Sequence, residues 1–111
     1  MSGYDNGSNE FVEAALGYRE MIAKSKLALK ALSEVKPGDL EKKEREVYDS
    51  AMRSLHAQLK GAVCDINGKK STLNEAEKAT FGAIQLELSD IADGVKKIGT
   101  SNGISIDDVV D

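Results

Sequence analysis

The two side chains with the most versatile chemistry in this chain are its single cysteine, Cys64, and its single histidine, His56. A thiol activated by an imidazole is a common nucleophilic pair. If the segment that joins them is helical, Cys64 lies about 80° around the helix from His56, so the two side chains point in different directions. One histidine and one cysteine are also too few for a typical zinc site. The sequence therefore predicts no catalytic residues, no metal site and no cofactor.

The segment that follows His56 gives the one alternative with a defined chemistry. Residues 55–61 read Leu-His-Ala-Gln-Leu-Lys-Gly. This pattern partly resembles the histidine phosphotransfer domains of two-component signalling, which are small helical bundles with an exposed histidine, a lysine three positions later and a glycine four positions later. Here Lys60 and Gly61 come one position later, which places Gly61 about 140° around the helix from His56. The resemblance is confined to this segment, and it implies a phosphotransfer module that uses His56 and Lys60.

Three apolar stripes at helical spacing predict the elements that position these side chains. The third stripe is the most regular, with alternating intervals of three and four residues. Few of the apolar residues are aromatic, which favours closely packed helices over a β-sandwich. The stripes comprise Phe11, Ala15, Tyr18, Ile22, Leu29 and Leu32; Val47, Tyr48, Ala51, Met52, Leu55, Leu59, Ala62, Val63 and Ile66; and Phe81, Ile84, Leu88, Ile91, Val95 and Ile98.

Local signals divide these stripes into separate helices. Pro37-Gly38 ends the first helix, and Asp39 is expected to cap the second. Asn67-Gly68 is typical of a helix C-terminus, and Thr72 and Glu75 have the spacing of a capping box. Short connections make successive helices antiparallel. We therefore expect an all-α chain: a flexible leader over residues 1–8, an elongated up-down-up three-helix bundle over 9–99 with helices at about 9–35, 39–66 and 72–98, and an acidic and apolar tail over 100–111.

The first predicted helix carries a second apolar arc beside its core-facing stripe. Val12, Leu16, Ala23 and Leu27 lie about 100–160° around the helix from Phe11. A three-helix monomer needs one apolar face on each helix, so this arc either widens the core or forms a contact surface for a partner. The second reading predicts self-association through Leu16 and Leu27.

The C-terminal segment combines β-branched apolar residues with acidic ones, which is unusual for a terminal segment without a binding role. Ile104, Ile106, Val109 and Val110 stand among a serine and three aspartates. Such a segment can add as an extended strand to the edge of a partner's sheet, or it can form a short helix that starts at Ser105. The simpler alternative is a tail that frays or folds back onto its own bundle.

Charge and composition favour a protein as the partner. The formal net charge is −4 and the isoelectric point is about 5.0, which weakly disfavours a nucleic acid or an anionic membrane. The start of the chain does not resemble a signal peptide, and a lone cysteine suits a reducing compartment. We therefore expect a cytoplasmic protein, in the host cytosol if a virus encodes it.

Together these observations predict a non-enzymatic protein-protein interaction module, such as an adaptor, a small regulator or inhibitor, or an assembly subunit. The candidate binding residues are Leu16, Leu27, Ile104, Ile106, Val109 and Val110. The alternatives are the phosphotransfer module of His56 and Lys60, and weak binding of nucleic acid by the lysines and the arginine of the first helix.

Overall fold

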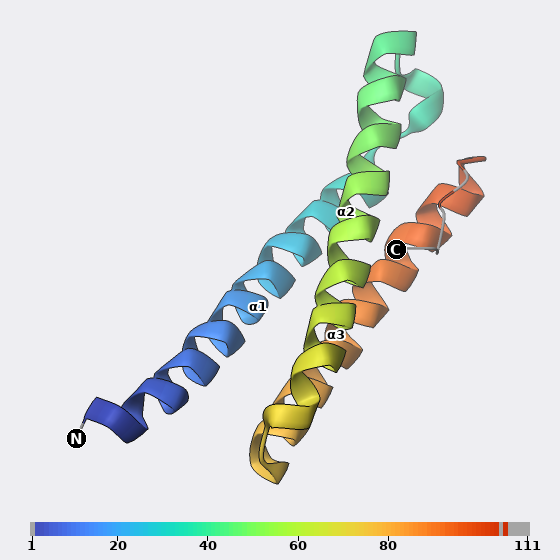
Figure 1. Cartoon of the computed structure of the whole chain (residues 1–111). Coiled ribbons are helices and arrows are strands. Elements are labelled where there is room, and N and C mark those ends of the chain that lie inside the picture. The colour runs from blue at the N-terminus through green and yellow to red at the C-terminus, as the bar shows by residue number, and fades with distance from the viewer. Residues whose placement is uncertain (1, 105, 107–111) are drawn as a thin grey trace.

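The computed structural model describes residues 2–104 and residue 106, with side chains described from residue 10 onward. Its α-helices are α1 (Ser2–Glu34), α2 (Lys42–Lys69) and α3 (Glu75–Ser101). Short 3-10 turns, Pro37–Asp39 and Lys70–Thr72, lie between them. These residues include no strand, and the molecule measures 58 × 23 × 19 Å. The predicted all-α, elongated, up-down-up arrangement of three helices is confirmed (Figure 1).

The helices do not contribute equally to the bundle. α3 packs extensively against both α1 and α2, whereas α1 and α2 touch each other at few points. In Figure 1 the N-terminal part of α1, drawn in blue, diverges from α2 and α3. Because α3 holds the other two helices, the α1–α2 side of the bundle is its open side.

The core mostly follows the predicted stripes and is mostly aliphatic, but Val47 and Ala51 of the second stripe are exposed. Met52, Leu59, Leu88 and Val95 have no exposed surface. Burial of a leucine or valine side chain contributes about 1.5–3 kcal/mol, so contacts of α3 with both neighbours dominate the stability of the bundle. The buried apolar set is Ala15, Ile22, Tyr48, Met52, Leu59, Ala62, Ile66, Phe81, Ile84, Leu88, Ile91, Ala92, Val95, Ile104 and Ile106.

An aromatic cluster attaches the N-terminal half of α1 to α3. The ring of Phe81 stacks on the ring of Phe11 with centroids 5.2 Å apart, and it meets the ring of Tyr18 edge-on at 5.8 Å. The ammonium group of Lys69, at the end of α2, lies 5.6 Å from the centre of the Tyr18 ring. Offset-stacked and edge-to-face pairs of this kind each add about 0.5–1.5 kcal/mol beyond the burial of their area.

The first helix begins earlier than the sequence predicts. α1 starts at Ser2, whereas we expected a flexible leader over residues 1–8 and a helix from about residue 9. Once a helix has formed, each added residue gains a backbone hydrogen bond without a new nucleation cost. A polar N-terminal segment can therefore extend an existing helix even without an apolar face of its own.

The caps of the other two helices are also shifted along the sequence. The N-cap of α2 is Glu41 rather than Asp39, and that of α3 is Asn74 rather than Thr72. Each forms a capping box with the glutamate three positions later, Glu44 and Glu77 respectively. The cause is the same at both places, because a 3-10 turn includes the residue that we expected to act as the cap. α2 likewise continues through Gly68 to Lys69.

The chain after α3 folds back onto the bundle. Gly103 has a φ of +75°, and the Ile104 amide donates to the carbonyl of Gly99 at 2.8 Å. Ile104 and Ile106 are consequently buried. Gly99 makes room for this return, since a Cβ atom there would overlap the side chain of Ile106.

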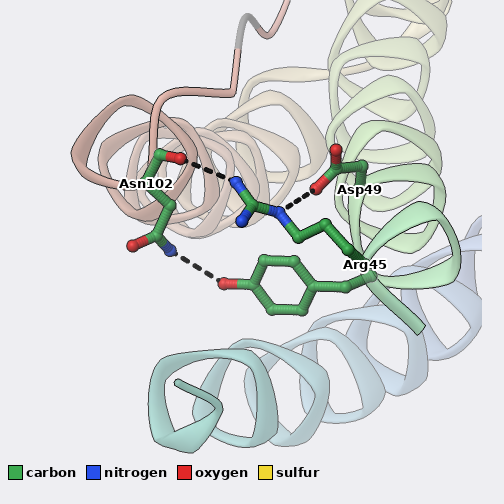
Figure 2. A network of polar contacts seen from close by, with 4 residues as sticks. Arg45, Asp49 and Asn102 are labelled. Atoms are coloured by element: carbon green, nitrogen blue, oxygen red, sulfur yellow. Dashed lines mark hydrogen bonds and ion pairs between the residues drawn. The ribbon is translucent and has the colours of Figure 1, made fainter. Parts of the chain in front are cut away.

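A polar network holds the same segment to α2 (Figure 2). The Arg45 guanidinium donates to the carbonyl of Asn102 at 2.9 Å and to the Asp49 carboxylate at 3.2 Å. The Asn102 side-chain amide in turn donates to the hydroxyl of Tyr48 at 2.9 Å. These contacts fix the position at which the chain leaves α3, and they are independent of the apolar contacts of the two isoleucines.

Replacing Gly103 with alanine is expected to destabilise the protein by about 1 kcal/mol, because the left-handed conformation is costly for a residue with a Cβ atom. Space is not the cause, since a Cβ atom at Gly103 would meet nothing within 4 Å. Gly82, inside α3 with equally open surroundings, is the matched control. Gly82→Ala should stabilise by up to about 1 kcal/mol through helix propensity. Urea unfolding curves measure both changes, and equal effects of the two substitutions would contradict the assignment.

Candidate protein-binding surface

The second arc of the first helix, predicted from spacing, lies on the surface of the bundle. Val12 is 48% exposed, Leu16 is 61% exposed and Leu27 is 69% exposed, and Ala23 between them is also exposed. The opposite side of the same helix carries the buried Ile22. The arc therefore does not widen the core of this chain, and we refer to Val12, Leu16, Ala23 and Leu27 as the outer face of α1.

A charged pair lies next to the two leucines of this outer face. The Lys24 ammonium and the Glu20 carboxylate are 3.0 Å apart, and their side chains are 74% and 69% exposed. At 100° per residue both lie between the leucine edge of α1 and the side of α1 that turns toward α2. An exposed pair of this kind contributes at most about 1 kcal/mol to stability, so its charges remain accessible to a partner.

Beyond the charged pair, a groove runs between α1 and α2. Its volume is about 600 Å³, and both helices contribute glycine or alanine to its wall. A Cβ atom on Gly17 or Gly61 would meet nothing within 4 Å, which shows how open the groove is at these points. The residues that line it are Gly17, Tyr18, Glu20, Met21, Lys24, Ser25, Ala28, Leu55, Gln58, Gly61, Ala62 and Asp65.

Sequence reasoning did not identify this groove. The stripes predict which side chains face the core, but a gap between two helices depends on how far apart their axes lie. One signal was available: Gly17 and Ala28 directly follow Leu16 and Leu27, so a large residue and a small one recur together eleven positions apart.

The predicted binding residues of the tail are placed differently from those of α1. Ile104 is 5% exposed and Ile106 is 9% exposed, so both belong to the core rather than to a strand that is free to join a partner. This burial counts against their predicted role in partner binding, because apolar side chains close to an apolar bundle gain more by packing on it than by remaining in water. Val109 and Val110 lie outside the described residues.

His56 is positioned in a way that does not suit phosphotransfer. Its side chain is 2% exposed, and it lies on the core-facing side of α2 one turn after the fully buried Met52. Lys60 is half-buried, and Gly61 lines the groove rather than the surroundings of the imidazole. A phosphodonor must reach the ring nitrogen of the histidine, so this burial counts against the alternative.

The remaining chemical candidates stay apart from one another. Cys64 is exposed and forms no disulfide. Among residues whose structure is described, no three His, Cys, Asp or Glu side chains gather in a way that could hold a metal ion. Lys26, one of the lysines of α1, lies 4.0 Å from Glu87 of α3. This pair reduces the basic surface that a nucleic acid would need.

Comparison of the chain with protein-family models, with curated proteins and with solved structures gives no match. In the described part of the chain, no helix has both the length and the apolar character that crossing a bilayer requires. The outer face of α1 and the groove beside it are therefore the candidate functional site of this chain.

Proposed function

We propose that this chain is a non-enzymatic protein-protein interaction module that binds its partner through the outer face of α1. The observation that supports this most directly is the exposure of Leu16 and Leu27, at 61% and 69%, on a helix whose core-facing side is already packed. Single exposed apolar residues are ordinary, but two leucines on one helix edge beside an open groove can both be covered by one partner helix.

The energetics of the helix support the same proposal. Each exposed leucine gains about 1.5–3 kcal/mol when a partner covers it, whereas in the isolated chain it contributes little to folding. The outer face can therefore supply binding energy without changing the bundle. The half-open arrangement of α1 and α2 offers a partner a second wall to pack against.

The double substitution Leu16→Glu with Leu27→Glu is expected to abolish binding and leave the fold intact. Exposed positions tolerate substitution within about 0.5 kcal/mol each, because no core contact is lost. The measurement uses a photoreactive amino acid at Ala23, between the two leucines, in cells that make the chain. Irradiation should give a discrete adduct that contains this chain and a protein, and the double substitution should remove it.

Leu86 supplies the control position, since it is 67% exposed on α3. The photoreactive residue at position 86 should give no such adduct, and circular dichroism should show the same helicity for all variants. Equal labelling from positions 23 and 86, or an adduct that persists in the double variant, would refute binding through the outer face.

A further inference from the structure

We propose that the partner which covers the outer face of α1 is a second copy of this chain, paired antiparallel through α1 about a two-fold axis at the level of Ile22. This inference rests on the proposed function, because it specifies the occupant of the same surface. It follows from the way in which apolar, charged and small residues are arranged symmetrically around Ile22.

The apolar side chains are self-complementary in this register. Leu16 and Leu27 are eleven residues apart, which is close to three helical turns, so they lie within about 20° of each other on one edge of α1. In an antiparallel pair related by a two-fold axis, the same edge of each helix meets. Leu16 of one copy then lies within about 1.5 Å, along the axis, of the level of Leu27 of the second copy. The contact therefore covers Leu16 and Leu27 of both copies at the same time.

The charges are complementary in the same register. Glu20 and Lys24 are equally far from Ile22 in the sequence, on either side of it. Antiparallel pairing therefore places Glu20 of one copy opposite Lys24 of the second copy, and the reverse. Since the two side chains already lie 3.0 Å apart within one chain, the dimer joins two such pairs into a ring of four alternating charges. A charge ring at the centre of the helix pair favours this register over shifted ones.

The groove side of α1 permits the close approach that this pairing requires. Gly17 and Ala28 are also eleven residues apart, and they share the edge of α1 that faces the groove. In the antiparallel register Gly17 of one copy meets Ala28 of the second copy, so no large side chain separates the helices at these two points. The second copy's α1 then covers the open side of the groove, next to Gly61 of α2.

The basic residues of α1 do not oppose the pairing. Arg19 and Lys26 lie about 100–120° around the helix from Glu20, on the side that turns toward α3. Lys26 is directed to Glu87 of α3, at 4.0 Å. Arg19 and Lys26 therefore point away from the contact and do not repel the same residues of the second copy.

Sedimentation equilibrium of the purified chain tests the association and its charges. The wild type should be a dimer at tens of micromolar. Glu20→Lys and Lys24→Glu should each weaken the dimer by at least about 10-fold, because each makes the ring single-signed. An equimolar mixture of these two variants should recover the dimer, since each lysine of one variant then lies opposite a glutamate of the other across the contact. A monomeric wild type, or a mixture no stronger than its components, would overturn the proposal.

Disulfide cross-linking tests the direction and the register. On a Cys64→Ser background, Glu13→Cys and Ala31→Cys introduce thiols at two exposed positions. These positions are five full turns apart on one side of α1 and equidistant from Ile22. Oxidation of the mixture should give the heterodimeric disulfide, whereas each variant alone should stay uncross-linked because its own copies lie about 27 Å apart. Cross-linking of each variant alone, without enrichment in the mixture, would indicate parallel helices and overturn the proposal.

The two experiments separate this inference from the proposed function. If the purified chain is monomeric and the photoreactive residue at Ala23 captures another protein in cells, the outer face binds proteins but the second-copy inference is wrong. If position 23 captures nothing beyond the Leu86 control, both are wrong.

Discussion

Replacing Phe81 with alanine is expected to lower the free energy of unfolding by about 4 kcal/mol, the cost typical of removing a buried aromatic ring. Phe81 is 1% exposed, and its ring contacts the rings of both Phe11 and Tyr18. The substitution leaves a cavity and also removes two aromatic contacts. Because these contacts attach the N-terminal half of α1 to α3, the loss should be greatest in that half of the helix.

Urea unfolding gives the size of this effect, and hydrogen exchange gives its location. Amides of α1 before Ile22 should lose more protection than amides of α2 in the Phe81→Ala protein. Leu86→Ala is the matched control on the same helix, since Leu86 is 67% exposed and its truncation should change stability by less than about 0.5 kcal/mol. If Phe81→Ala costs less than 1 kcal/mol, or if protection falls evenly over the three helices, the aromatic cluster does not attach α1 as described.

The fold could be predicted from the sequence because apolar spacing reports directly on the side of a helix that must be buried. The stripe from Phe81 to Val95 maps onto the most buried helix face of the molecule, and Pro37-Gly38 marks a real chain reversal. Helix ends were predicted less well, because a capping pattern such as that of Thr72 competes with a neighbouring one such as that of Asn74. Which pattern forms the cap depends on whether the connection includes a 3-10 turn, and local residue types do not decide that.

The candidate site could be predicted only in part, for a related reason. The angular distance of Leu16 and Leu27 from the core stripe singles them out in the sequence, but only the packing of the three helices decides that they stay exposed. The groove and the burial of Ile106 depend on distances between elements remote in sequence. The room that Gly99 leaves for Ile106 is visible only once the chain has folded back.

Gln85 illustrates the same limit, because it is a polar residue on the buried face of α3. Its side-chain amide donates to the carbonyl of Val63 at 3.0 Å and to the side-chain oxygen of Asn67 at 2.9 Å. Both donors of the amide are therefore used by α2, near the end of that helix. A stripe of apolar residues gives no indication of such a contact, since the partner atoms belong to another element.

Replacing Gln85 with glutamate is expected to destabilise the protein by about 3 kcal/mol at neutral pH, because it buries an unpaired charge beside two acceptor oxygens. The new side chain has the same shape, so no cavity forms and the effect is electrostatic. Burial and the facing oxygens should raise the pKa of the introduced carboxyl in the folded state. Ionisation of this carboxyl is then less favourable in the folded state than in the unfolded state. The loss of stability is therefore complete above the raised pKa, and it diminishes as the pH falls toward the pKa of glutamate in the unfolded chain.

The test compares urea unfolding of Gln85→Glu at pH 7 and near pH 4.5 with that of Gln58→Glu. Gln58 is exposed at the edge of the groove, so the same chemical change there should alter stability by less than about 0.5 kcal/mol at either pH. The difference between the two variants isolates the contribution of the contacts that Gln85 makes with α2. A Gln85→Glu protein as stable as the Gln58→Glu protein at pH 7, or one whose stability deficit grows on acidification, would show that these two hydrogen bonds do not join α3 to the end of α2.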